Sequence, residues 1–125
     1  MARILLAEDE ESLRQFLARA LGQDGHEVVA TSDGAQALDA LVAAKGDFDL
    51  LLTDIRMPLM DGIALALAAA RDYPNLVILL MTGYADQRER AHGLDALIHD
   101  VITKPFTLAD IKSAVNEALA SHKAR

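Results

Sequence analysis

The chain has 125 residues, the length of one domain, and its 52% hydrophobic and 25% charged residues are typical of a folded globular protein. It contains no cysteine, which excludes disulfides, thiolate metal sites and cysteine nucleophiles. A net charge of −7 argues against direct nucleic-acid binding, since that needs a basic surface to neutralise phosphates. The apolar runs are far shorter than the ~20 residues of a bilayer helix, and residues 1–7 lead to Glu8 without a signal-peptide pattern. We therefore expect a cytoplasmic protein with no membrane partner.

Apolar runs and helical periodicity alternate along the chain. Short apolar runs predict five strands, at residues 4–7, 28–30, 49–54, 77–81 and 101–103. Apolar residues at offsets of three and four predict helices after these strands, at residues 13–21, 38–42, 63–71 and 108–119. A further helix is expected at residues 86–94, where the sequence is polar nearly all round and offers a poor core face. Thr107 is expected to cap the last helix.

The five strand–helix repeats predict one α/β domain over residues 1–125. Such alternation gives a doubly wound sheet of five parallel strands, with right-handed crossovers and helices on both faces. In sheets of this kind the ligand site lies beyond the carboxyl ends of the strands.

Polar residues that can carry chemistry stand at four of these strand ends. They are Glu8 and Asp9, Asp54, Thr82, and Lys104 with Pro105. Singly, each has an ordinary structural explanation, such as a helix-capping acid, a turn residue or a solvated lysine. Their joint placement at one edge of a sheet instead indicates a site.

The residue types favour phosphoryl chemistry with a metal ion. Clustered carboxylates raise each other's pKa unless a cation neutralises them, and an all-oxygen ligand set suits Mg²⁺ or Mn²⁺. An aspartate beside such a metal can act as a nucleophile and form an aspartyl-phosphate, while an ammonium and a hydroxyl hold the phosphoryl oxygens. No glycine-rich phosphate loop occurs, which argues against a nucleotide donor.

These motifs resemble the receiver domain of bacterial response regulators along the whole chain. The resemblance rests on the Glu8–Asp9 pair, on LLLTDIRMPLMDG around Asp54, on MTG at residues 81–83, and on TKPF at residues 103–106. It implies a flavodoxin-like, CheY-like sheet with strand order 2-1-3-4-5. It also implies a two-component signalling domain, rather than an enzyme, whose partners are a histidine kinase or histidine phosphotransfer protein and an output protein.

The resemblance also implies a role for each site residue. Asp54 would accept the phosphoryl group, and Thr82 and Lys104 would contact it. Mg²⁺ would be held directly by Asp9, Asp54 and the backbone carbonyl of Arg56, and through water by Glu8. Pro105 would follow a cis peptide bond.

One position departs from the family pattern. Many receivers carry an inward-swinging aromatic residue three positions before the lysine, where this chain has Val101. We expect Tyr84, in the loop after residues 77–81, to carry the signal instead, and Arg56 and Tyr84 to set the lifetime of the phosphorylated state.

Within the family the chain looks most similar to single-domain regulators of the CpdR type, in which phosphorylation decides whether substrates are recruited to the ClpXP protease. The alternative within the family is a receiver attached to a hybrid histidine kinase. An aspartyl-phosphate phosphatase on the same fold is the alternative from another class, but residues 55–61 are too short for the lid such an enzyme needs. The four histidines are expected on the surface, and Phe16, Phe48 and Phe106 in the core.

Overall fold

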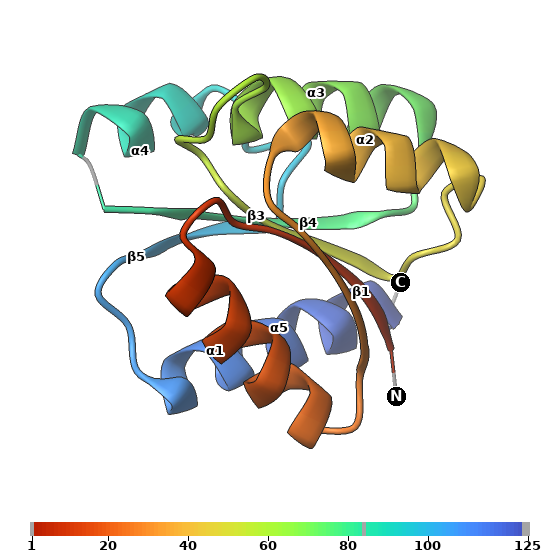
Figure 1. Ribbon diagram of the computed structural model, residues 1–125. Helices are drawn as coiled ribbons and strands as arrows, with labels where there is room; N and C mark the ends of the chain where they lie inside the picture. Colours follow the sequence, from red (N-terminus) through yellow and green to blue (C-terminus); the bar gives the residue numbers. More distant parts are fainter. Residues whose placement is uncertain (1, 84, 124–125) are drawn as a thin grey trace.

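The computed structural model describes residues 2–83 and 85–123 and contains one five-stranded sheet (Figure 1). All strand pairs are parallel and the order is β2-β1-β3-β4-β5, which confirms the predicted flavodoxin-like α/β fold. The strands are β1 (Arg3–Ala7), β2 (Glu27–Thr31), β3 (Leu50–Asp54), β4 (Val77–Thr82) and β5 (Asp100–Thr103).

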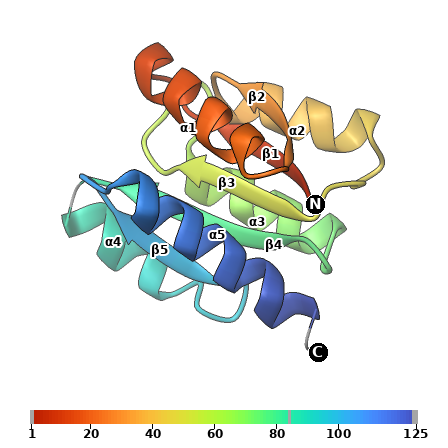
Figure 2. The same ribbon diagram turned by 90° about the horizontal axis from the view of Figure 1, so that it is seen from below.

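Five helices cover the two faces of this sheet. They are α1 (Glu11–Gln23), α2 (Gly34–Ala43), α3 (Gly62–Asp72), α4 (Ala85–His92) and α5 (Leu108–Lys123). Figure 1 shows α2, α3 and α4 on one face, and Figure 2 shows α1 and α5 on the other. None of the helices in residues 2–83 and 85–123 is both long and apolar enough to cross a membrane.

Alternate residues of the central strands fill two separate cores. Leu5, Leu51 and Ile78 point toward α2 and α3, whereas Leu6 and Leu79 point toward α1 and α5. Every residue of β3 and β4 is buried, because helices cover both faces of these strands. This rigid centre fixes where the strands end.

Side chains of the loops before three helices define where those helices begin. Asp33 Oδ1 accepts a hydrogen bond from Gln36 N, and Asp61 Oδ1 accepts one from Ala64 N. The predicted cap at Thr107 is confirmed, since its hydroxyl accepts from Asp110 N at 3.1 Å while Asp110 Oδ2 accepts from Thr107 N at 3.0 Å.

Three expectations about burial were wrong. Phe16 on α1, expected in the core, and Leu108 on α5, which the helical period predicts to face inward, are exposed at 43% and 38% of their surface. Each sits at the margin of its helix's apolar stripe, where sequence periodicity does not fix the rotation of the helix to one residue. His26 was expected on the surface, but its side chain is only 7% exposed and its Nδ1 accepts a hydrogen bond from Ala2 N at 3.1 Å.

Candidate functional site

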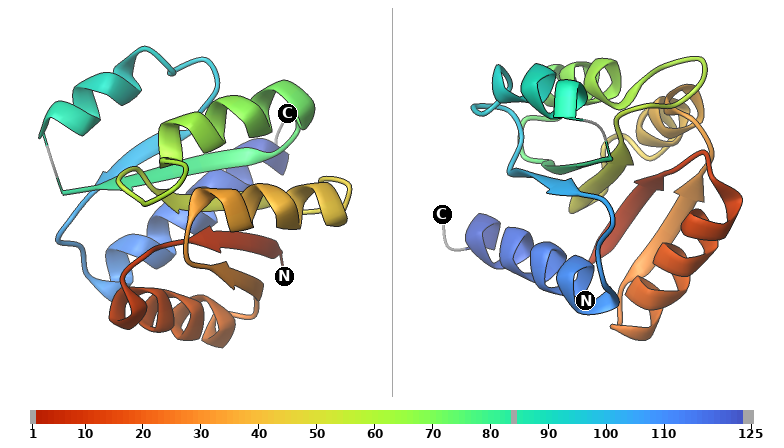
Figure 3. Two further views of the ribbon diagram at one scale, coloured as in Figure 1. Left: turned by 45° about the horizontal axis from the view of Figure 1, so that its top comes forward. Right: turned by 90° about the vertical axis from the view of Figure 1, so that its left-hand side faces the viewer.

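Three carboxylates meet where β1 and β3 end. Glu8 and Asp9 follow the last residue of β1, and Asp54 is the last residue of β3, the neighbouring strand in the sheet. One carboxylate oxygen from each of the three residues lies within 4.8 Å of the others. Figure 1 shows the carboxyl ends of the strands at its left-hand side, and the right-hand view of Figure 3 looks onto this edge.

These residues line a hollow of about 500 Å³, which we call the acidic hollow. Its lining residues are Glu8, Asp9, Glu10, Asp54, Arg56, Gly83 and Lys104. Five of the site residues expected from the sequence are therefore brought together around one space: Glu8, Asp9, Asp54, Arg56 and Lys104. Thr82 is not among the lining residues, because its side chain is only 1% exposed at the end of β4.

Lys104 joins two of the carboxylates. Its Nζ lies 3.0 Å from Glu8 Oε1 and 3.0 Å from Asp54 Oδ2. Burial alone would lower the pKa of Lys104, but hydrogen bonds and attraction from the two carboxylates outweigh burial and raise it. The ammonium therefore stays charged and offsets part of the repulsion within the acidic hollow.

Glu8 is the most deeply buried of the three acids, with its side chain 1% exposed. Burial, together with repulsion from Asp54, raises the pKa of Glu8 to about 7, although hydrogen bonds from Glu10 N and Lys104 oppose the shift. Burial also raises the pKa of Asp54, and the charge of Asp9 adds to the effect. One ammonium thus does not fully compensate the three acids.

This donor set fits a hard divalent cation. The contributing atoms are carboxylate oxygens, with no thiolate or imidazole, which suits Mg²⁺ better than Zn²⁺. Because burial and mutual repulsion raise the pKa values of Glu8 and Asp54, additional positive charge would stabilise the ionised cluster.

The residues expected to modulate the site lie around its rim. Arg56 is exposed beside the acidic hollow. The Lys104–Pro105 peptide bond is cis, as expected. Val101 is half-buried on β5 and packs against the core under α2 and α3. Tyr84 lies outside the described residues.

Two further residues near the site were not singled out from the sequence. Gly62, the first residue of α3, approaches the Asp54 carbonyl so closely that any Cβ would overlap it, and its N–H donates to Ile55 O at 2.7 Å. Arg14 on α1 donates from Nη1 to the Glu8 carbonyl at 2.9 Å. The glycine of the MDG segment was the available signal for Gly62, whereas nothing in the sequence indicates the contact of Arg14.

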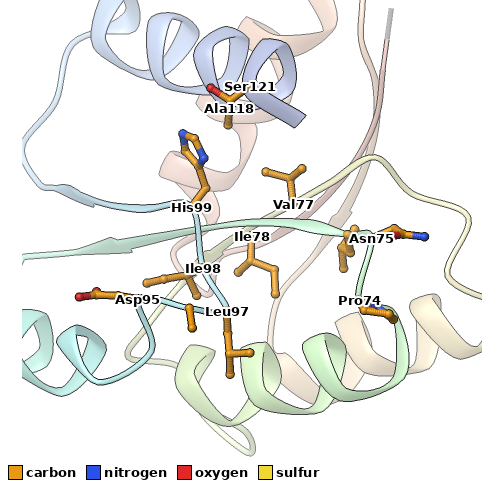
Figure 4. A pocket seen from close by; sticks show the side chains of 12 residues that line it. Pro74, Asn75, Val77, Ile78, Asp95, Leu97, Ile98, His99, Ala118 and Ser121 are labelled. Carbon is orange, nitrogen blue, oxygen red and sulfur yellow. The ribbon is translucent and has the colours of Figure 1, made fainter. Parts of the chain in front are cut away.

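A second hollow, the amino-edge pocket, lies at the opposite end of the strands. It has a volume of about 440 Å³ and is lined by residues 74–78, residues 95–99, Ala118 and Ser121. Figure 4 shows His99 on the side of Ala118 and Ser121, with Asp95 and Leu97 on the other side of the strand. Among the described residues, the only group of three acidic or histidine side chains close enough to share a metal ion is the one in the acidic hollow.

Comparison with known proteins connects this geometry to a family. The family model of the response regulator receiver domain matches residues 4–116. The response regulator receiver protein CpdR of Brucella abortus (strain 2308) is 40% identical over 119 residues, which cover 95% of this chain and 98% of CpdR. Other curated relatives are longer, and the chain spans about half of their length.

Solved structures give the same result. A response regulator receiver domain protein from Clostridium thermocellum superposes with a TM-score of 0.90 at 25% identity, covering 99% of this chain and 98% of that one. The response regulator TrrA from Thermotoga maritima, in complex with Mg²⁺-BeF, superposes with a TM-score of 0.84 at 27% identity, covering 94% and 99% of the two chains.

Proposed function

The chain belongs to the response regulator receiver family of two-component systems, and on this premise we propose that Asp54 accepts a phosphoryl group from a histidine kinase or histidine phosphotransfer protein. The observation that carries the proposal is the acidic hollow itself. Carboxylate oxygens of Glu8, Asp9 and Asp54 lie within 4.8 Å of one another, and the Lys104 ammonium lies 3.0 Å from both Glu8 and Asp54.

In the proposed reaction an Asp54 carboxylate oxygen attacks the phosphorus of a phosphohistidine. A P–O bond forms as the P–N bond breaks, and the electron pair of that bond returns to the histidine nitrogen. Lys104 already contacts Asp54 and is placed to pair with the new phosphoryl oxygens. Thr82, buried at the end of β4, has to move toward the rim to reach them.

Mg²⁺ is the proposed cofactor. Asp9, Asp54 and the Arg56 carbonyl would hold it directly, and Glu8 would act through water. When bound, Mg²⁺ offsets the charge of the carboxylates and of the incoming phosphoryl group. The Mg²⁺-BeF in the TrrA structure supports this proposal, since its fold superposes on 94% of this chain.

Phosphorylation would act by changing protein contacts. It adds about −1.5 to −2 charges and three acceptor oxygens at the rim. We place the readout surface on α4, β5 and α5, because β5 leads directly into Lys104. We propose that Arg56 and Tyr84 determine the lifetime of the phosphorylated state. We also propose that Tyr84 carries the signal, because position 101 holds a valine where many receivers have an aromatic residue.

The finer role we propose for this single receiver domain, residues 1–125, is cytoplasmic control of the delivery of substrates to a ClpXP-type protease. The 40% identity with CpdR, over 98% of that protein's length, supports this role over that of a receiver in a hybrid kinase.

The deciding experiment incubates the chain with acetyl phosphate and Mg²⁺ and measures its intact mass. We expect one added phosphoryl group in the wild-type chain and none in Asp54→Asn. Continuous turnover of a small phosphate ester without an adduct would instead favour the phosphatase. For the finer role, a pull-down should capture protease or substrate proteins in a manner that differs between phosphorylated wild type and Asp54→Ala.

A further inference from the structure

The turn that carries Glu8 and Asp9 is fixed at each polar group of Glu8. The Glu8 N–H donates to the Thr31 carbonyl at 3.1 Å, and Glu8 Oε2 accepts from Glu10 N at 3.1 Å. The Glu8 carbonyl accepts from Arg14 Nη1 at 2.9 Å. Arg14 thus provides the side-chain contact to the peptide group that joins Glu8 to Asp9.

Asp9 depends on this peptide group for its direction. Its side chain is exposed, and within the described part of the chain no hydrogen bond holds its carboxylate. The orientation of the Glu8 carbonyl sets the plane of the peptide bond to Asp9, and this plane, together with the φ angle of Asp9, determines where the Asp9 side chain leaves the backbone. Without a restraint on that plane, the Asp9 carboxylate would spend less time near Asp54.

Arg14 is well placed to supply the restraint. It lies one turn into α1, where its own N–H donates to the Glu10 carbonyl at 2.9 Å. Its side chain is half-buried, and its guanidinium spans back over the turn to the Glu8 carbonyl. The helix α1 therefore holds the turn that carries Glu8 and Asp9 in place.

We propose that Arg14 is a positioning residue for the Mg²⁺ site, acting through the Glu8–Asp9 peptide group. The proposal rests on the proposed function. Position and charge predict opposite effects. If Arg14 acted only through its charge, its removal would make the acidic hollow more negative and strengthen Mg²⁺ binding. If it positions Asp9, its removal weakens Mg²⁺ binding despite the lost positive charge.

The test compares Arg14→Gln with Arg19→Gln in the full chain. Both variants remove one positive charge from α1, but Arg19 is exposed and lies more than one turn further along the helix. The dissociation constant for Mg²⁺ is measured by titration calorimetry. We expect it to rise about tenfold in Arg14→Gln, as for loss of a group that orients a metal ligand, and to stay within about twofold of wild type in Arg19→Gln.

A second readout separates positioning from a general loss of structure. The rate of modification by acetyl phosphate should fall in Arg14→Gln at low Mg²⁺ and recover to the wild-type value at saturating Mg²⁺. Thermal unfolding checks that the variants are folded. If Arg14→Gln does not fold, Arg14→Lys, which keeps the charge but not the planar fork, is compared with Arg19→Lys in the same two measurements.

Equal Mg²⁺ affinity in the Arg14 and Arg19 variants, or tighter binding in Arg14→Gln, would overturn the inference. So would a wild-type chain that does not bind Mg²⁺ at all. A wild-type chain that binds Mg²⁺ but never acquires a phosphoryl group on Asp54 would overturn the proposed function alone, because the comparison of Mg²⁺ affinities would still decide the role of Arg14.

Discussion

The two ends of the same parallel strands carry hollows of similar size, about 500 Å³ at the carboxyl edge and about 440 Å³ at the amino edge. Their chemistry differs completely. The acidic hollow gathers the carboxylates of Glu8, Asp9 and Asp54 and the ammonium of Lys104, from the turn after β1, the end of β3 and the residue after β5. The amino-edge pocket contributes Asp95 and His99, both exposed (Figure 4). Convergent charge, rather than volume, therefore separates the candidate site from an ordinary surface depression.

The largest expected effect comes from replacing Asp54, the proposed phosphoryl acceptor in the acidic hollow. Asp54→Asn should abolish modification by acetyl phosphate, since the amide cannot form the acyl phosphate, and should leave the far-UV circular dichroism unchanged. Intact mass measures the outcome. The matched control is Asp95→Asn in the amino-edge pocket, which should be modified like wild type. Modification of the Asp54 variant on another side chain would refute the assignment.

The next effect concerns the metal. Asp9→Asn should weaken Mg²⁺ binding by more than about tenfold and slow phosphoryl transfer correspondingly, because it removes a proposed direct ligand. Glu8→Gln should have a milder effect on both, because Glu8 is proposed to act through water. Titration calorimetry and transfer rates with and without excess chelator measure these effects. Full transfer in chelator would remove the metal from the mechanism.

The raised pKa of Glu8 predicts a dependence of stability on pH. Because burial raises its pKa from 4.5 to about 7, the folded chain binds more protons than the unfolded chain between these values. The free energy of unfolding without Mg²⁺ should therefore fall as pH rises from about 4.5 to 7, by up to about 1.4 kcal/mol per pH unit. The raised pKa of Asp54 adds a contribution of the same sign.

Urea unfolding across this pH range measures the slope. Glu8→Gln should flatten it without abolishing it, and saturating Mg²⁺ should do the same in wild type by favouring the ionised carboxylates. Asp95→Asn again serves as the control and should keep the wild-type slope. A free energy of unfolding that rises with pH over this range in the wild-type chain would contradict the effect of burial on the pKa of Glu8.

The smallest expected effect comes from replacing Val101 on β5. Val101 is half-buried against the core under α2 and α3, so Val101→Ala should lower the free energy of unfolding by about 1 kcal/mol. In Val101→Ala, phosphorylation and state-dependent partner binding should stay close to wild type. Tyr84→Ala, in contrast, should lose state-dependent partner binding. Loss of partner discrimination in Val101→Ala alone would place the relay at position 101.

The sequence was sufficient to predict the fold because strand and helix patterns alternate so regularly. The fully buried β3 and β4 were visible as continuous apolar runs, and the rule for parallel sheets then placed Glu8, Asp9, Asp54 and Lys104 at one edge. The contact between Lys104 and two carboxylates follows from this placement. The structure adds that Lys104 Nζ lies 3.0 Å from each of these two carboxylates.

The sequence could not predict contacts that depend on the rotation of a helix about its axis or on the close approach of distant chain segments. A rotation of α1 by part of a turn decides that Phe16 is exposed, and the apolar period is too coarse to fix that rotation. The contact of Arg14 depends on the orientation of the Glu8 backbone carbonyl, which no pattern of residue types predicts. His26 is buried because β2 begins beside Ala2, a tertiary neighbour 24 residues away.

The Lys104 ion pairs have a consequence for folding. Lys104 lies 96 residues after Glu8 and 50 residues after Asp54. Both ion pairs therefore form only when chain segments that are distant in sequence have come together. The charge balance of the acidic hollow is thus a property of the assembled sheet and not of any one segment of the chain.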